Sequence, residues 1–156
     1  MFVLSKLLEL GDTIFIVLRK QNLIFLHWYH HIATLLYAWY GYADHASTSR
    51  WGVNINYSIH SLMYSYYALR AFGLRIPKQI AMLITSLQII QMMIGVYVKF
   101  YAYQRKSSGE NCDINNSTIF WGSIMYFSYF LLFVKFFINS YFSGGSSSKK
   151  LIEKSD

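Results

Sequence analysis

Residues 21–43 of the chain read QNLIFLHWYHHIATLLYAWYGYA and contain no Asp, Glu, Lys or Arg. An apolar run of about 20 residues is long enough to cross the hydrocarbon core of a bilayer as a helix. Inside this run stands His27-Trp28-Tyr29-His30-His31, which holds three of the chain's five histidines. The stretch therefore predicts a membrane helix that carries polar side chains within the membrane.

Runs of similar length recur along the chain, and the composition agrees with them. Residues 51–69, 79–98 and 114–134 are also free of charge, whereas residues 1–18 contain three charged residues. Only 13% of the chain is charged and 54% is hydrophobic, while soluble domains carry about 25% charged residues. We predict an all-α, polytopic membrane helical bundle, with a membrane-embedded domain over residues 1–142 and a flexible tail over residues 143–156. The expected transmembrane helices are about 1–18, 24–42, 52–70, 79–101 and 118–142.

The basic residues predict how the helices are oriented. Residues 19–20, residues 70–78 and the C-terminal tail hold eight Lys and Arg, whereas residues 42–50 and 103–117 hold three. Short loops rich in Lys and Arg lie on the cytosolic side of a membrane. We therefore expect a cytosolic C-terminus. No basic face is visible that would indicate a nucleic-acid partner.

Polar residues share one face on each of the first four predicted helices. Residues three or four apart lie on the same helix face, and His27, His30 and His31 have this spacing. Polar groups inside a membrane are costly and usually functional. Taken alone, each face could also have a purely structural role, as an ion pair, an aromatic stripe or a hydrogen bond between helices. Taken together, the four faces favour a polar cavity that the helices share. The faces are Lys6, Glu9, Asp12 and Thr13; His27, His30 and His31; Asn56, His60, Met63 and Tyr67; and Thr85, Gln88 and Gln91.

These residues leave three kinds of chemistry open. Imidazoles bind metals, although histidine-box di-iron oxidoreductases of the desaturase or hydroxylase kind use a larger set of histidines. Histidine can also form a covalent acyl intermediate, with His60 as an acid–base partner. The single cysteine, Cys112, falls in the predicted 103–117 loop and is excluded as the nucleophile. Buried Lys, Glu, Asp and His also fit a proton path or a non-enzymatic transporter.

With these residues, the chain resembles the ELO family of very-long-chain fatty acid elongases. The resemblance covers residues 1–142 and rests on four motifs in the family's order, one on each predicted helix. Trp28-Tyr29 and Asn22 make the chain more similar to elongases of saturated and monounsaturated acyl-CoA, in the palmitoyl range. The motifs are Lys6-x-x-Glu9-x-x-Asp12-Thr13, His27-x-x-His30-His31, Asn56-x-x-x-His60-x-x-Met63-Tyr64-x-Tyr66-Tyr67 and Thr85-x-x-Gln88-x-x-Gln91.

The resemblance implies the condensing step of fatty acid elongation. A long-chain acyl-CoA and malonyl-CoA would give a 3-oxoacyl-CoA, CoA and CO2, without a metal or other cofactor. His30 would carry the acyl group as an acyl-histidine, His60 would be its partner across the cavity, and His27 and His31 would complete the catalytic set. The substrates would be bound by Lys6, Glu9, Asp12, Arg19, Gln21, Asn56, Tyr66, Thr85, Gln88 and Gln91.

The resemblance also implies where the protein works and with what. We expect a multi-pass protein of the endoplasmic reticulum membrane, in contact with membrane lipid. Its expected partners are the other enzymes of the elongation cycle: the ketoacyl reductase, the dehydratase and the enoyl reductase. The family has a seven-helix fold, so we expect an N-terminally truncated chain that lacks the first two helices. The acyl tunnel would then have a gap in its wall, and we expect this chain alone to make little or no elongation product.

Overall fold

The computed structural model describes residues 2–18, 20, 25–43, 49–109 and 114–142. These residues form five helices and no strand, so the predicted all-α fold is confirmed for the described part of the chain. The helices are α1 (Phe2–Leu18), α2 (Phe25–Ala43), α3 (Ser49–Ala71), α4 (Lys78–Ser107) and α5 (Asn116–Tyr141).

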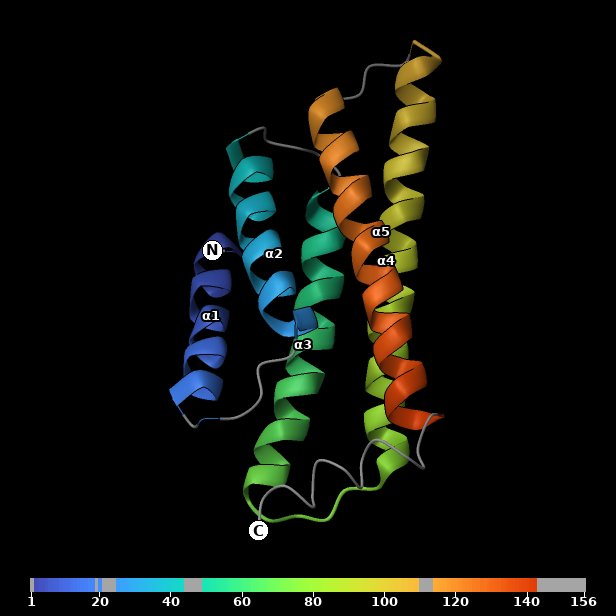
Figure 1. Ribbon diagram of the computed structural model, residues 1–156. Coiled ribbons are helices and arrows are strands. Elements are labelled where there is room, and N and C mark those ends of the chain that lie inside the picture. The colour runs from blue at the N-terminus through green and yellow to red at the C-terminus, as the bar shows by residue number, and fades with distance from the viewer. Residues whose placement is uncertain (1, 19, 21–24, 44–48, 110–113, 143–156) are drawn as a thin grey trace.

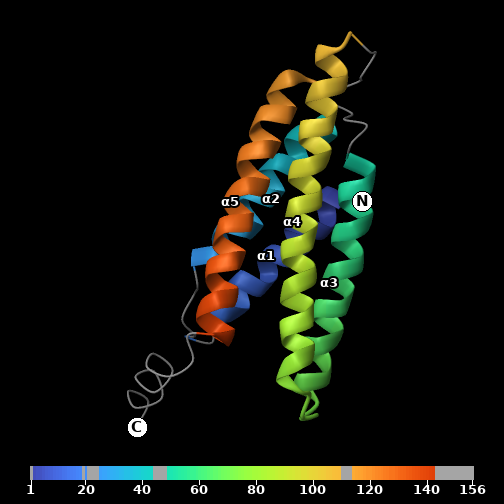
Figure 2. The ribbon, with the colours of Figure 1, turned by 90° about the vertical axis from the view of Figure 1, so that its right-hand side faces the viewer.

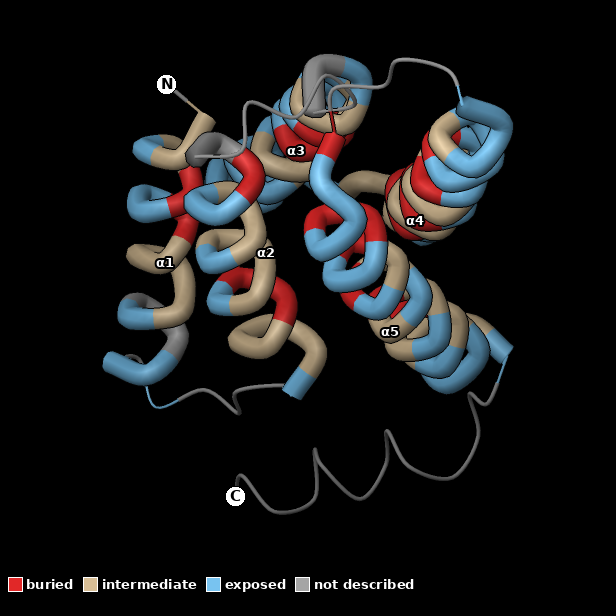
Figure 3. The backbone as a smooth tube through the Cα atoms, turned by 90° about the horizontal axis from the view of Figure 1, so that it is seen from above, coloured by how far each residue is buried: buried red, intermediate tan, exposed pale blue. Residues whose placement is uncertain are grey.

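The five helices surround a common interior. Helices α4 and α5 form a long antiparallel pair, and α1 lies beside α2 (Figure 1). Helix α2 packs on α5 and α3 packs on α4 (Figure 2). Side-chain hydrogen bonds then join α1 to α3, from Lys6 to Asn56 and from Tyr64 to Asp12. Seen along the bundle, the buried faces of the helices are largely turned toward one another (Figure 3).

The connection between α3 and α4 is set by a glycine and a proline. Gly73 has φ +82°, a left-handed conformation that favours glycine. Its N–H bonds to Arg70 O, and the Leu74 N–H bonds to Leu69 O, a pattern that satisfies the last carbonyls of a helix. Pro77 then caps α4 with φ −56°, where its missing N–H is not needed. The chain therefore reverses direction within a few residues, and α3 lies beside α4.

Two helices have the character of membrane spans. Among the described residues, α4 and α5 are the helices that are long and apolar enough to cross a membrane by length and composition. Their outer faces carry large exposed apolar side chains such as Leu83, Phe127 and Leu131. Helices α1, α2 and α3 are shorter or more polar, because they carry the charged, histidine and tyrosine motifs. Their crossing of the membrane stays a prediction.

A hydrophobic cluster fixes α2 against the α4–α5 pair. Met92, Met125, Tyr129 and Phe133 form its buried centre, and Tyr29 of α2 packs against them. The close approach of α2 to α5 depends on a glycine, because a Cβ at Gly122 would overlap the Tyr37 hydroxyl. This packing determines where the histidines of α2 lie.

Candidate active site

A broad cavity of about 930 Å³ lies inside the bundle, and all five helices contribute to its wall. Each of the four polar faces predicted from the spacing contributes to this wall, the first of them only through Asp12. Of the proposed site residues, those that line this cavity are Asp12, His27, His30, His31, His60, Tyr66, Thr85, Gln88 and Gln91. The structure places them together, and their individual roles stay predictions.

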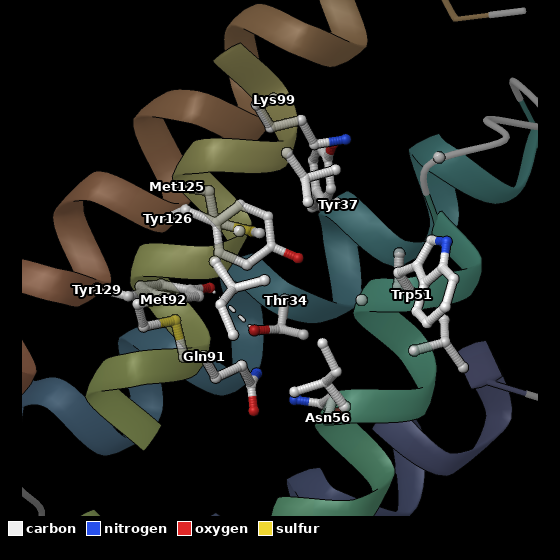
Figure 4. A pocket seen from close by; sticks show the side chains of 18 of the residues that line it. Thr34, Tyr37, Trp51, Asn56, Gln91, Met92, Lys99, Met125, Tyr126 and Tyr129 are labelled. Carbon is white, nitrogen blue, oxygen red and sulfur yellow. Dashed lines mark hydrogen bonds between the residues drawn. The ribbon is translucent and has the colours of Figure 1, made fainter. Parts of the chain in front are cut away.

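A second, narrow cavity of about 170 Å³ adjoins the broad one. His30, Gln91 and Met92 line both cavities and therefore mark the junction. Figure 4 shows the narrow cavity, with Gln91 and Asn56 toward one end, Tyr37 and Lys99 toward the other, and Tyr126 between them. Its walls are mainly apolar and aromatic, whereas the broad cavity carries most of the polar site residues.

His30 is held at the junction by α5. It is buried, and its ring lies 4.9 Å from the Tyr129 ring and 5.9 Å from the Phe133 ring, measured between centroids. The Tyr129 hydroxyl donates a 3.0 Å hydrogen bond to His30 O and lies 2.9 Å from the Thr34 hydroxyl. Since the single phenol proton is used toward His30, Thr34 is the donor to Tyr129. These contacts leave the imidazole little rotational freedom.

The other histidines gather around His30. The His31 ring lies 5.2 Å from it, and the His60 ring of α3 lies 6.1 Å away at an interplanar angle of 17°. The His27 ring lies 4.5 Å from His31. Four imidazoles from two helices thus share one end of the broad cavity, as the i, i+3, i+4 spacing predicts for the three on α2.

An ion pair lies behind these histidines. The Lys6 ammonium donates to the two carboxylate oxygens of Glu9 at 2.7 and 2.9 Å, and to Asn56 Oδ1 at 2.6 Å. All three side chains are buried. Asn56 lines the narrow cavity, whereas Lys6 and Glu9 line neither cavity. The pair connects α1 to α3 and places a carboxylate beside His31 and His60.

Asp12 and Tyr66 lie on the wall of the broad cavity. The Tyr64 hydroxyl donates to Asp12 Oδ2 at 2.5 Å, a second link between α1 and α3. Tyr66 accepts a weak 3.4 Å hydrogen bond from the Arg70 guanidinium, which lies at the same end of the cavity. This end, near the last turn of α3, therefore combines phenols with a positive charge.

The residues of α4 line the opposite wall. Thr85 is buried, donates to Ala81 O at 3.0 Å and lies 3.3 Å from the Tyr141 hydroxyl of α5. The Gln88 amide lies 3.4 Å from the Met63 sulfur of α3. Gln91, one turn further, lies at the junction of the cavities. These side chains face inward although α4 is one of the two helices that are long and apolar enough to cross a membrane.

Some predicted residues cannot be placed, and others had not been predicted. Arg19, Gln21 and Cys112 lie outside the described residues. Tyr129 and Tyr141 contact the predicted site residues His30 and Thr85, and Thr34 contacts Tyr129, but none of the three was in the predicted set. The sequence places Tyr129 in an aromatic-rich helix, but aromatic side chains that face lipid occur in the same helix. The sequence therefore does not distinguish Tyr129 from them.

The geometry suits nucleophilic and acid–base chemistry by imidazole. A buried histidine, with a second histidine across the cavity, can form a covalent intermediate and exchange protons. Within the part of the chain that the structure describes, no three His, Cys, Asp or Glu side chains converge to hold a metal ion.

Comparisons with known proteins give a consistent result. The profile of the GNS1/SUR4 family, ELO, matches residues 1–149. The chain is 52% identical over 140 residues to very long chain fatty acid elongase 6 of Homo sapiens, covering 90% of this chain and 52% of that protein. The Gallus gallus elongase 6 is 49% identical over 150 residues, 96% of this chain and 56% of its own length. Long chain fatty acid elongase 1 of Caenorhabditis elegans is 45% identical over 156 residues, 99% of this chain and 54% of its own length.

The chain therefore spans about half the length of these relatives. No solved structure matches it. The profile match agrees with the motif-based resemblance over almost the same residues, and it does not favour an iron oxidoreductase or a transporter.

Proposed function

Because this chain belongs to the GNS1/SUR4 (ELO) family, we propose that it carries the condensing centre of a fatty acid elongase. The proposed reaction joins a long-chain acyl-CoA to malonyl-CoA and gives a 3-oxoacyl-CoA, CoA and CO2. Saturated and monounsaturated acyl chains in the palmitoyl range are the proposed substrates. The names of the relatives support elongation of fatty acids as the reaction class.

One observation carries the proposal: His30 lies where a broad cavity that holds most of the polar site residues adjoins a smaller one lined by apolar and aromatic side chains. An acyl-CoA has the same two-part character. The first carbons of its alkyl chain would enter the narrow cavity, since a dry cavity of about 150 Å³ is enough to accept benzene. Its CoA portion fits the broad cavity, whose outer end carries Arg70. The thioester between the two portions would then lie at His30.

The first half-reaction transfers the acyl group to His30. An imidazole nitrogen of His30 attacks the thioester carbonyl carbon, a C–N bond forms and the C–S bond breaks. CoA leaves as a thiolate, and the proton lost by His30 is transferred to it through a neighbouring histidine, so that CoA departs as a thiol. His60, across the cavity, is the proposed carrier of this proton.

The second half-reaction forms the new C–C bond. Malonyl-CoA enters the broad cavity after CoA has left, and its carboxylate departs as CO2. The electron pair left on the α-carbon attacks the acyl carbon, and the C–N bond to His30 breaks. The imidazole nitrogen takes up one proton from solvent, which restores the neutral histidine, so the overall condensation consumes one proton. No metal or other cofactor takes part in the proposed steps.

The proposal includes the setting of the reaction. The chain is a membrane-embedded protein by family and by the apolar helices α4 and α5. We propose residence in the endoplasmic reticulum membrane with the C-terminus in the cytosol. The substrates would be acyl-CoA and malonyl-CoA, and the product would pass to the reductases and the dehydratase of the elongation cycle.

Mass spectrometry of the acylated protein tests the proposal. We incubate the purified chain in detergent with palmitoyl-CoA alone, digest it and search for a palmitoyl adduct. We expect the adduct on the peptide that contains His30, with release of CoA, and no adduct in His30→Ala. Elongation itself is measured with radiolabelled malonyl-CoA in a chimera, in which residues 1–142 replace the matching segment of the human relative.

Three outcomes would contradict the proposal. An adduct on another residue would overturn the assignment of His30. Stoichiometric iron in the purified chain would favour an oxidoreductase, and a His30→Ala variant that still transfers acyl groups would favour a transporter or relay.

A further inference from the structure

The charged pair Lys6–Glu9 is buried behind the histidines instead of facing a cavity. Lys6 is 1% exposed and Glu9 is 8% exposed. Neither side chain lines the broad or the narrow cavity. Glu9 is also engaged through both carboxylate oxygens by the Lys6 ammonium. This position favours a role exerted through the histidines over direct contact with substrate, which the motif resemblance had implied for both residues.

Glu9 is placed to act on two histidines at once. Its Oε2 lies 3.6 Å from His60 Nδ1 and 3.8 Å from His31 Nδ1. The His60 Nδ1 is buried and makes no hydrogen bond among the described residues, and the Glu9 carboxylate is close enough to become its acceptor after a small shift. A carboxylate only accepts hydrogen bonds, so it favours the proton on Nδ1 of each ring and leaves Nε2 with a free lone pair. Hydrogen bonds of this kind are often long in unliganded sites and tighten when substrate binds.

The carboxylate is itself held in place from two helices. Lys6 binds both of its oxygens from one turn earlier on α1, and Asn56 of α3 binds Lys6. Asn56 and His60 are four residues apart on α3, so the same helix that carries His60 also anchors the ion pair. The direction of the Glu9 carboxylate is therefore fixed relative to His60.

We propose that Glu9 is a positioning residue that orients His60, and with it His31, for acyl transfer to His30. This inference rests on the function proposed above. When the acyl carbon bonds to one nitrogen of His30, the proton of the other nitrogen passes to His60 Nε2. The resulting imidazolium is stabilised by the negative charge of Glu9 behind it. His60 then gives the proton to the departing CoA thiolate, and each histidine is neutral again.

Three variants separate positioning from a merely structural role. Glu9→Gln removes the charge but leaves Lys6 buried and unpaired, a change that destabilises proteins strongly. The double variant Lys6→Met/Glu9→Gln removes both charges. No unpaired charge is then buried, so the destabilisation is avoided, while the carboxylate is still absent. Ser5→Ala is the matched control on the same helix, because the Ser5 hydroxyl donates to Phe2 O and lies outside the proposed machinery.

The measurements are the melting temperature of the full chain in detergent, its affinity for palmitoyl-CoA, and the rate of His30 acylation at saturating palmitoyl-CoA. For the double variant we expect a melting temperature and an affinity for palmitoyl-CoA close to those of the original sequence. We expect its acylation rate to fall on the order of 10²-fold, the contribution of one acid–base group. Ser5→Ala should keep all three values.

Each other outcome decides against the inference. Recovery of the acylation rate in the double variant would mean that Glu9 only neutralises Lys6. Lost affinity with an unchanged rate in the bound complex would make Glu9 a substrate-binding residue. If both the original chain and the chimera with the human relative bind palmitoyl-CoA but form no adduct on His30, the proposed function fails first, and the inference that rests on it is overturned with it.

Discussion

Tyr129 is the side chain that fixes the position of His30. It is 1% exposed, its hydroxyl links His30 O to Thr34, and its ring packs against the imidazole. A phenol in this place joins α5 to α2 at the point where the two cavities meet. The proposed acyl carrier therefore depends on a residue of another helix for its geometry.

We predict that Tyr129→Phe destabilises the chain by about 1 to 3 kcal/mol, because the Thr34 hydroxyl loses its buried partner. The ring contact with His30 is kept, so acylation of His30 should slow without a large loss of palmitoyl-CoA affinity. Thermal unfolding in detergent and mass spectrometry of the adduct measure the two effects. Tyr97→Phe is the control, since Tyr97 is 66% exposed on α4. Equal effects of the two substitutions would contradict the prediction.

Single residues could be predicted from the sequence where they are both polar and periodic. His27, His30 and His31 were placed on one face by spacing alone, and they do line one cavity. Tyr129 was missed because α5 also carries Tyr126, Phe127 and Phe130, and spacing does not show which aromatic faces inward. The resemblance implied that Glu9 binds substrate; the structure places it outside both cavities, and its role stays a prediction.

At the scale of elements, the helices are fitted together through glycines. A Cβ at Gly95 of α4 would lie 2.5 Å from the Tyr126 ring of α5, closer than side chains approach each other. A Cβ at Gly11 of α1 would have no atom within 4 Å. The same substitution in two helices should therefore have effects of opposite sign.

We predict that Gly95→Ala destabilises the chain by about 1 to 3 kcal/mol through overpacking. Gly11→Ala should stabilise it by about 0.5 to 1 kcal/mol, because alanine loses less conformational freedom in a helix. The melting temperatures of the two variants in detergent provide the comparison. Adding Tyr126→Ala to Gly95→Ala removes the ring that the methyl group meets, so the two changes should be less than additive. A stabilised Gly95→Ala variant would show that α4 and α5 are not packed as described.

The uncharged runs predicted the helices well in number but less well in length. The predicted span 79–101 continues as α4 to Ser107, beyond Arg105 and Lys106. Hydropathy marks the part of a helix that suits the hydrocarbon core, whereas the backbone can stay helical outside it. The end of α4 is instead determined by Gly109, which has φ +79°. The spacing of apolar residues does not indicate this end.

For the whole molecule, the basic loops predict which end of the bundle faces the cytosol. The turn after α3 would be cytosolic and the end of α4 lumenal. We predict that, in a Cys112→Ser background, Phe72→Cys reacts with an impermeant maleimide in intact microsomes. Ser108→Cys should react only after permeabilisation. Both positions are exposed, so solvent access is comparable.

The reverse labelling pattern would invert the topology and place the Arg70 end of the broad cavity in the lumen. CoA thioesters would then have to enter from the lumenal side, which contradicts the proposed use of cytosolic substrates. Labelling of both positions in intact vesicles would contradict a membrane barrier between them. Labelling of the Phe72→Cys variant in intact microsomes, without labelling of the Ser108→Cys variant, would support the predicted orientation.

The Lys6–Glu9 pair also has a consequence for how the protein is made. Chains emerge from the ribosome with the N-terminus first, so in the predicted transmembrane arrangement α1 would meet the membrane before α4 and α5 exist. A single charge at the bilayer centre costs about 2.5 to 3.5 kcal/mol during insertion. Because Lys6 and Glu9 are three residues apart in one helix, each finds its counter-ion without waiting for another segment. Asn56 is synthesised later, as part of α3, and then accepts a hydrogen bond from Lys6, whose charge Glu9 has already neutralised.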